Sequence, residues 1–231
     1  MKKIGLIGGI GPESTVSYYR QLVEGLKDKM GPEVLPRLSI ETLSAFEVFK
    51  MCKEMRYDDL TAYVLDAIHC LAAAGADYAA LTGNTPNIVF DDLKAKSPIP
   101  LVSAIEATLA TAQRRNLKTV GLLGTVFTMS NSFFRTPFEK AGIEIVCPNG
   151  EQMSYIQDRI EAELEHGVVT DDAREGFVQI IRSMHEQQGI QQVILGCTEL
   201  PLLLSDENCP VPCLDTVDIH VATLIDLMTE G

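Results

Sequence analysis

Three residues with reactive or hydrogen-bonding side chains follow directly after a short apolar segment. Residues 193–195 predict a buried strand, and Gly196 separates it from Cys197, Thr198 and Glu199. In open α/β sheets ligands bind just beyond the carboxyl ends of strands. Backbone N–H groups at the start of a following helix can stabilise a thiolate there. Cys197 is therefore a candidate reactive thiol, and a buried structural thiol is the alternative, since free cysteine is often buried.

Two other predicted strands also end in segments that could approach a ligand. Residues 3–7 lead into a glycine-rich loop, residues 8–15, in which the third glycine of a dinucleotide-binding G-x-G-x-x-G pattern is missing. The loop is therefore interpreted as a place where a small ligand approaches the backbone, or as a plain tight turn. Residues 78–81 predict a strand that leads into Gly83, Asn84 and Thr85.

The elements that carry these segments repeat along the chain. Residues 118–125 resemble residues 2–9 at an offset of 116, and the strand end at Cys197 follows that at Gly83 by 114. Predicted strands alternate with predicted helices throughout, which is typical of parallel sheets. The pattern predicts an α/β fold with two similar domains related by pseudo-two-fold symmetry, formed by residues 1–98 plus 211–231 and by residues 99–210.

Composition narrows the possible partners and location. The 231 residues carry a formal net charge of −13, which argues against binding to nucleic acid. No segment approaches the roughly 20 apolar residues of a membrane span, so no membrane partner is expected. The six cysteines form no C-x-x-C pair and no zinc spacing with histidine. We expect no metal and a reduced, cytoplasmic protein; Cys209 and Cys213 are interpreted as unrelated thiols, with a metal site as the alternative.

A duplicated architecture suggests a particular chemistry. Two similar halves place their strand ends opposite each other across a cleft, and so deliver side chains to opposite faces of one small substrate. Inversion of a stereocentre needs such a pair, because one group removes the α-proton and the other returns a proton from behind. Two thiols can do this, one as the thiolate and the other as the thiol.

Four segments carry a resemblance to a known family: residues 4–15, Gly83-Asn84-Thr85, residues 121–125 and residues 196–199. In them the chain resembles the aspartate/glutamate racemase family, whose members work without pyridoxal phosphate. The resemblance covers essentially the whole chain. It implies an active site in the interdomain cleft, a small carboxylate or amino-acid substrate, no cofactor, and a homodimer.

The same resemblance implies roles for individual residues. Cys197 matches a catalytic cysteine. Asn84, Thr85 and Thr198 match positions that hold the substrate α-carboxylate or amine, and Thr125 matches a further pocket position. Glu199 could bind the substrate amine, tune Cys197 or cap a helix.

The chain departs from the family at the first catalytic position. Where the family has Cys-Asn-Thr-x-His, this chain has Gly83-Asn84-Thr85-Pro86-Asn87. Glycine cannot shuttle a proton, so Gly83 is interpreted as a vacant partner position, filled by the Thr82 hydroxyl or by water. Both are poor proton donors beside a thiol. We therefore expect racemisation to be slow or one-sided, and the substitution Gly83→Cys to increase exchange.

Two alternatives follow from the same vacancy. Arylmalonate decarboxylases resemble this family and keep one cysteine with glycine at the other position, as Cys197 and Gly83 do here, but the chain has no tryptophan and only 6% aromatic residues. The other alternative is a non-catalytic carboxylate-binding relative. The distal carboxylate of an acidic substrate would need a cation, for which Lys50, Lys53 and Arg56 are candidates.

Two further positions bear on the site. Some aspartate racemases resemble one another in carrying lysine near the position of Glu165, and the acid found here weakens the case for aspartate. His220, near the predicted start of the last helix, could also approach the site.

Overall fold

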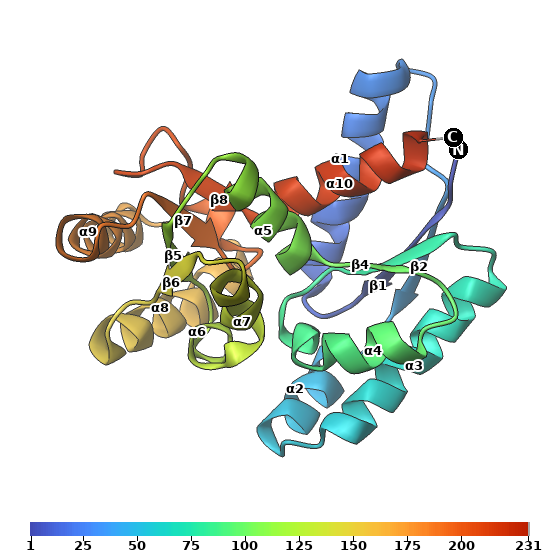
Figure 1. Cartoon of the computed structure of the whole chain (residues 1–231), viewed down its shortest axis with the longest axis horizontal. Coiled ribbons are helices and arrows are strands. Elements are labelled where there is room, and N and C mark those ends of the chain that lie inside the picture. The colour runs from blue at the N-terminus through green and yellow to red at the C-terminus, as the bar shows by residue number, and fades with distance from the viewer. Residues whose placement is uncertain (231) are drawn as a thin grey trace. The chain divides into compact units, whose positions relative to one another are not determined.

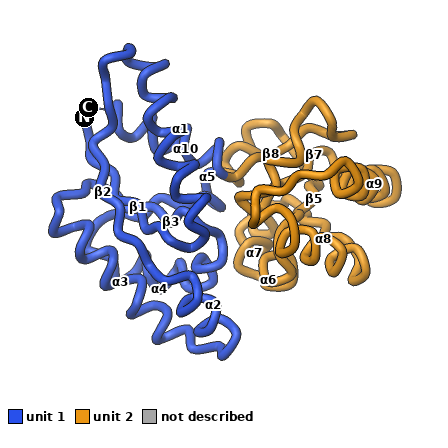
Figure 2. Tube along the Cα trace, turned by 180° about the vertical axis from the view of Figure 1, so that it is seen from behind, with its two compact units in different colours: residues 1–107, 217–231 blue, residues 108–216 orange. Residues whose placement is uncertain are grey.

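The computed structural model describes residues 1–230, which divide into two compact units (Figures 1 and 2). Each unit is built on its own four-stranded parallel sheet with helices packed against it. The first unit contains residues 1–107 and the C-terminal segment from Val217, and the second contains residues 108–216. The predicted α/β class and the two similar parallel-sheet domains are therefore confirmed.

The sheet of the first unit has the strand order β2-β1-β3-β4. Its strands are β1 (Ile4–Gly8), β2 (Leu38–Thr42), β3 (Tyr78–Leu81) and β4 (Leu101–Val102). Its helical elements are α1 (Pro12–Met30), α2 (Ala45–Lys53), α3 (Tyr57–Ala73), the 3₁₀ turn η1 (Thr85–Val89), α4 (Phe90–Lys96), the first part of α5 (Ala104–Arg114) and α10 (Thr216–Thr229).

Strand β1 contains only isoleucine, leucine and glycine. It is buried along its whole length because helices cover both of its faces. Ile4 and Leu6 share one buried cluster with side chains of α1 and α10. The alternate residue Gly5 faces Leu71 of α3, and a Cβ built there would meet that side chain at 2.9 Å. The glycine therefore lets α3 pack closely against the sheet.

The second unit repeats this plan with the strand order β6-β5-β7-β8. Its strands are β5 (Thr119–Leu123), β6 (Glu144–Val146), β7 (Gln192–Leu195) and β8 (Cys213–Asp215). Its helical elements are α6 (Val126–Ser130), α7 (Ser132–Lys140), α8 (Gly150–Ala162), η2 (Leu164–His166), α9 (Asp171–Gln188) and η3 (Leu200–Leu202). Apolar side chains of α8 and α9 form one core with those of β5 and β7.

The register of the two sheets agrees with the repeat found in the sequence. Ile7 pairs with Leu81 in the first sheet, and Leu123 pairs with Leu195 in the second. These pairs differ by the same offsets of 116 and 114 residues. Beyond them, the Thr82 N–H donates to the Ile7 carbonyl at 3.0 Å, and the Gly196 N–H donates to the Leu123 carbonyl at 2.7 Å. The strand ends that carry the candidate residues are thus built alike.

The unit boundaries differ from the expected ones. The sequence division falls at residues 98/99 and 210/211, whereas the contacts divide the chain at 107/108 and 216/217. Strand β4 pairs with β3, which keeps residues 101–102 in the first sheet. Strand β8 pairs with β7, which keeps residues 213–215 in the second sheet. Strand pairing therefore keeps β4 in the first unit and β8 in the second.

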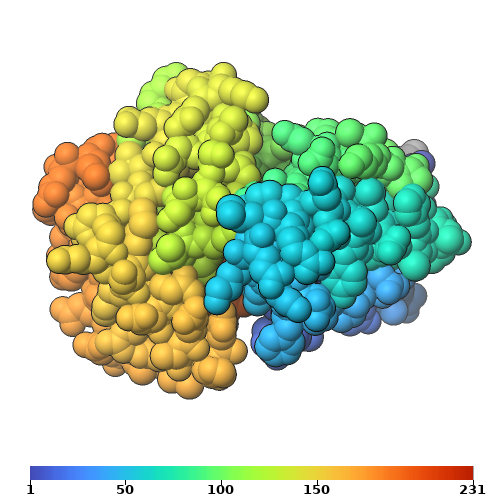
Figure 3. Space-filling model, turned by 90° about the horizontal axis from the view of Figure 1, so that it is seen from below, coloured from blue at the N-terminus to red at the C-terminus, as the bar shows by residue number. Residues whose placement is uncertain are grey.

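The surface of the first unit includes α2 and α3, coloured cyan in Figure 3. Large apolar side chains are exposed in and just after α2, among them Phe46 (86% exposed) and Met55 (73% exposed). Within residues 1–230, no helix combines the length and the apolar character that crossing a membrane requires.

A buried hydrogen-bonded histidine joins three elements of the first unit. The His220 ring on α10 is fully buried, and its Nε2–H donates to the Val102 carbonyl of β4 at 3.1 Å. Its Nδ1 lies 2.8 Å from the Tyr18 hydroxyl of α1 and accepts from it. This arrangement matches the neutral ring, with Nε2 as the donor and Nδ1 as the acceptor. Burial accordingly lowers the pKa of His220 to about 4, from an ordinary value of 6.5.

This network predicts that acid destabilises the fold. The pKa of His220 is lower in the folded chain than in the unfolded chain, so the unfolded chain binds the proton first. The contribution is present above pH 6.5 and is lost as the pH falls towards 4. We expect about 2 kcal/mol less unfolding free energy from this group at pH 5 than at pH 7, measured by urea denaturation.

The control is His220→Gln, whose amide can keep a donor and an acceptor but does not titrate. The variant should lose that part of the pH dependence which the wild type shows between pH 7 and pH 5. An unchanged slope would contradict the assignment of acid sensitivity to His220.

Candidate active site

The second sheet brings four of the predicted site residues to one edge. Strands β5 and β7 are neighbours, and Thr125 follows one while Cys197, Thr198 and Glu199 follow the other. The two strand ends approach closely: a Cβ built on Gly124 would lie 3.3 Å from the backbone of Gly196. The glycines at these two positions therefore allow the loops to lie against each other.

Cys197 and Glu199 form a hydrogen-bonded pair. The Cys197 thiol donates to Oε2 of Glu199 at 2.9 Å, and the Thr198 hydroxyl donates to the same oxygen at 3.0 Å. All three residues are partly exposed. The turn that begins η3 places them, since the Leu200 N–H donates to the Cys197 carbonyl at 3.1 Å. The Cys197 residue is thus partly exposed, while its side chain packs against the buried core of the second unit.

The surroundings of Cys197 favour the neutral thiol. Burial of the sulfur raises its pKa well above the ordinary value, and the negative charge of Glu199 and the hydrogen bond to it raise the pKa further. The more distant charge of Glu165, on η2, acts in the same direction. Burial and the charge of Glu199 also raise the pKa of Glu165. A thiol held in this way is a proton donor at rest, and its thiolate, once formed, is a strong base.

Thr125 caps the helix that follows it. It is the N-cap of α6, and its hydroxyl accepts from the Thr128 N–H at 3.3 Å. The same hydroxyl lies 3.2 Å from that of Thr128. Capping satisfies one of the free N–H groups of the first turn, which explains a threonine here without any ligand.

The remaining predicted residues lie together at the end of β3 in the first unit. Gly83 is buried, and Asn84 and Thr85 are partly exposed at the start of η1. The side-chain amide of Asn87 donates to the carbonyls of Gly83 and Asn84, at 3.2 and 3.0 Å. The sequence comparison noted Asn87 only as a departure from the family pattern, but here it fastens the loop that carries the candidate residues.

The surroundings of Gly83 leave little room for a side chain. A Cβ built on Gly83 would clash with the carbonyl oxygen of Ile10, in the glycine-rich loop after β1. The glycine is therefore required by the close approach of two backbones. No space for an additional side-chain atom is left on that side without a shift of the loop.

The Thr82 hydroxyl, the proposed substitute for the missing thiol, makes hydrogen bonds to other residues of the first unit. Thr82 is fully buried, and its hydroxyl donates to the Ile7 carbonyl at 3.2 Å and lies 3.1 Å from the Thr15 hydroxyl. Thr15 in turn accepts from the Gly9 N–H at 2.9 Å, and the Ser14 hydroxyl donates to the Thr82 carbonyl. These hydroxyls hold the glycine-rich loop against the end of β3.

The other sequence candidates lie elsewhere in the first unit. Arg56 forms exposed ion pairs with Asp59 and Glu54, at 2.7 and 3.2 Å. Lys50 and Lys53 are exposed on α2. His220 lies in the buried network described above, where it contacts Val102, the last residue of β4.

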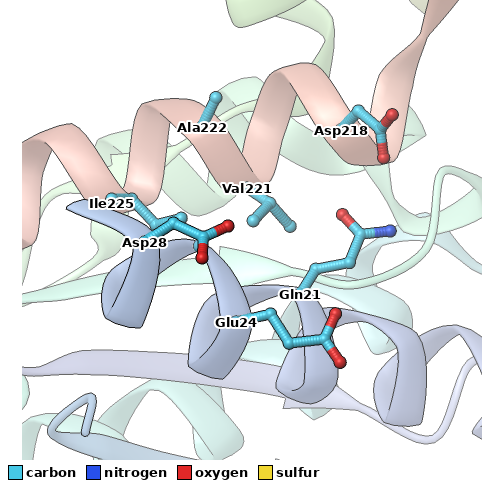
Figure 4. A pocket seen from close by; sticks show the side chains of 8 residues that line it. Gln21, Glu24, Asp28, Asp218, Val221, Ala222 and Ile225 are labelled. Atoms are coloured by element: carbon cyan, nitrogen blue, oxygen red, sulfur yellow. The ribbon is translucent and has the colours of Figure 1, made fainter. Parts of the chain in front are cut away.

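A surface groove runs between α1 and α10 (Figure 4). It is lined by Gln21, Glu24, Gly25, Asp28, Asp218, Val221, Ala222 and Ile225. Its lining includes none of the candidate site residues. Within residues 1–230, no group of three or more histidine, cysteine or acidic side chains could hold a metal ion.

The chain as a whole is similar to known racemases and their homologues. Residues 7–224 match the family described as Asp/Glu/hydantoin racemase. The structure of an aspartate racemase homologue from Pyrococcus horikoshii aligns over 100% of both chains, with a TM-score of 0.87 and 37% identity.

More distant relatives also align over most of the chain. The aspartate racemase of Picrophilus torridus shares the fold with a TM-score of 0.78 at 21% identity, over 99% of this chain and 94% of its own. The broad specificity amino-acid racemase RacX of Bacillus subtilis is 20% identical over 218 residues, covering 92% of each chain.

Proposed function

Because the chain belongs to the Asp/Glu/hydantoin racemase family, we propose that it is a cofactor-independent racemase of an acidic amino acid, aspartate or glutamate. The observation that carries the proposal is the Cys197–Glu199 pair, a thiol hydrogen-bonded to a carboxylate at the carboxyl end of a central strand. In this proposal the protein is a cytoplasmic homodimer.

In this proposal Cys197 and Glu199 transfer the α-proton at one face of the substrate. Glu199 lies 2.9 Å from the Cys197 sulfur, so it is positioned to accept the thiol proton. The resulting thiolate removes the α-proton of the amino acid, and in the reverse direction the thiol returns it. Asn84, Thr85 and Thr198 are proposed to hold the α-carboxylate and the amine, and Thr125 is a further proposed contact.

The position that the family resemblance pairs with Cys197 holds Gly83 in this chain. Gly83 has no side chain, and the Ile10 carbonyl closes the adjoining space. We propose that water protonates the carbanion from the face opposite Cys197, which makes the reaction slow or one-sided because the pKa of water lies far from that of a thiol.

Exchange of the α-proton in D₂O tests the proposal. The protein is incubated separately with L- and D-aspartate and with L- and D-glutamate, and deuterium at the α-carbon is followed by NMR. Incorporation from at least one enantiomer is expected, with unequal rates for the two. No incorporation from any of the four would refute racemisation of acidic amino acids.

The closed position at Gly83 also favours a second candidate, a single-thiol decarboxylase. Loss of CO₂ leaves a carbanion that needs only one protonation, so Cys197 alone would suffice. Release of CO₂ from a substituted malonate, without α-proton exchange of amino acids, would support this candidate. Calorimetric binding of a small dicarboxylate or acidic amino acid without either reaction would identify a non-catalytic relative.

The substitution Glu199→Gln tests the role of the carboxylate. Removal of the negative charge is expected to lower the pKa of Cys197, which its charge and hydrogen bond now raise. Alkylation of Cys197 by iodoacetamide at neutral pH, followed by peptide mass spectrometry, should become up to about tenfold faster. Exchange of the α-proton should nevertheless fall, since glutamine cannot accept the thiol proton.

The matched control is Glu186→Gln, which removes one carboxylate from the same unit on α9. It should change neither alkylation nor exchange. If Glu199→Gln left the alkylation rate unchanged, or raised exchange together with alkylation, the proposed role of Glu199 would be wrong.

A further inference from the structure

A backbone carbonyl next to the candidate residues of the first unit has no hydrogen-bond donor. Ile10, in the glycine-rich loop after β1, is 5% exposed, and its carbonyl oxygen lies where a Cβ on Gly83 would clash with it. Within residues 1–230, no N–H group or hydroxyl donates to this oxygen. Buried carbonyl groups are nearly always paired in folded proteins. The Ile10 carbonyl is therefore a candidate to accept a hydrogen bond from a ligand.

The loop that carries this carbonyl is fixed by its surroundings. The Gly9 N–H donates to the Thr15 hydroxyl at 2.9 Å, and the Thr15 and Thr82 hydroxyls lie 3.1 Å apart. Gly9 has a positive φ of 83°, which glycine adopts readily, and it lies so close to Leu43 that a Cβ would clash with the backbone there. These neighbours hold the Ile10 carbonyl in place before any ligand binds.

The carbonyl complements the polar groups that follow β3. Gly83 directly precedes Asn84 and Thr85, which are partly exposed at the start of η1. The amide of Asn84 and the hydroxyl of Thr85 can donate to a carboxylate, whereas the Ile10 carbonyl can only accept. An α-amino acid carries a carboxylate and an ammonium group on one carbon atom, so it matches a site that has donors and an acceptor side by side.

We propose that the Ile10 carbonyl accepts a hydrogen bond from the ammonium group of the substrate, and so selects α-amino acids over acids that lack an amine. The hydrogen bond is charge-assisted and supplies the donor that the carbonyl lacks. Thr15 is then a positioning residue, because its hydroxyl holds the loop without touching the substrate. The inference rests on the proposed binding of an acidic amino acid, and it disfavours the malonate substrate of the decarboxylase alternative.

The sequence allows this carbonyl to be observed selectively by NMR. Ile–Gly pairs occur only at residues 4–5, 7–8 and 10–11, so protein labelled with carbonyl-¹³C isoleucine and ¹⁵N glycine gives three HNCO signals. Ile4 and Ile7 lie in β1 and are internal controls, and the Ile7 carbonyl already accepts from the Thr82 N–H. Aspartate or glutamate should shift the Ile10 carbonyl signal. Succinate and glutarate, which lack the amine, should leave it unchanged.

A matched pair of variants tests the positioning role of Thr15. Thr15→Val keeps the shape of the side chain but removes the hydroxyl that accepts from Gly9, whereas Thr15→Ser keeps the hydroxyl. Thr15→Val should weaken aspartate binding by about tenfold or more in calorimetry, the loss typical of a hydrogen bond to a charged group. Succinate binding should not change, and Thr15→Ser should bind both ligands as the wild type does. A merely structural role would weaken both ligands alike.

The wild-type titration decides the question even if a variant folds poorly. The inference would be overturned by an Ile10 signal that follows succinate as closely as aspartate, by one that stays constant while aspartate binds, or by absence of amino-acid binding. Exchange of the α-proton, measured on the same samples, reports separately on the proposed function. Exchange without an amino-acid-specific Ile10 shift would remove only the role of the carbonyl. A specific shift without exchange would refute racemisation and leave that role in place.

Discussion

Cys197→Ser is expected to lower α-proton exchange by about 10²- to 10⁴-fold, the range typical for loss of a positioned acid–base group. The thiol donates to Glu199 at 2.9 Å and stands at the end of β7. Serine preserves the size and the hydrogen bond, but the pKa of its hydroxyl is too high for the group to exchange protons with an α-carbon. The measurement is deuterium incorporation in D₂O with the enantiomer that the wild type exchanges fastest.

The control for this substitution is Cys70→Ser, which removes an exposed thiol from α3. Exchange by this variant should equal that of the wild type. Both variants should unfold at similar urea concentrations, because neither changes side-chain volume appreciably. Retention of wild-type exchange by Cys197→Ser would show that another group transfers the proton, and the racemase mechanism proposed above would fail.

The second large effect is expected from substitutions of Gly83, where an added Cβ changes stability and an added thiol changes exchange. Any side chain there meets the Ile10 carbonyl, so both Gly83→Ala and Gly83→Cys should lower the unfolding free energy by about 1–3 kcal/mol. Gly150→Ala is the matched control, because a Cβ at Gly150 meets no described atom within 4 Å. Urea denaturation of the three variants measures the cost, and equal stability of all three would contradict the clash.

Comparison of the two Gly83 variants also separates the effect of an added thiol on exchange from the effect of an added Cβ on packing. Both share the cost of the Cβ, and only one carries a sulfur. If a second thiol is what the reaction lacks, α-proton exchange by Gly83→Cys should exceed that by Gly83→Ala, even if both fall below the wild type. Equal exchange by the two would show that the side chain at residue 83 does not reach the substrate. The earlier expectation of a simple gain over the wild type does not allow for the Ile10 contact.

Much of the fold could be predicted because its signals are local. The apolar strand at residues 78–81 and the helix Asp171–Gln188, with its Thr170 cap, follow from periodicity and capping chemistry within a few residues. The internal repeat predicted two similar sheets, and the equal register of Ile7 with Leu81 and of Leu123 with Leu195 confirms it. The exact unit boundaries could not be predicted, because local composition does not reveal which strands pair.

The sequence by itself determined the α/β class, the duplication and the two strand ends that carry the candidate residues. Only the tertiary structure decided how those residues are used. The Ile10 carbonyl lies against Gly83 from more than 70 positions away in the chain, and His220 meets Tyr18 from the other end of the sequence. Such contacts arise from packing of distant segments, and no pattern of neighbouring residues encodes them.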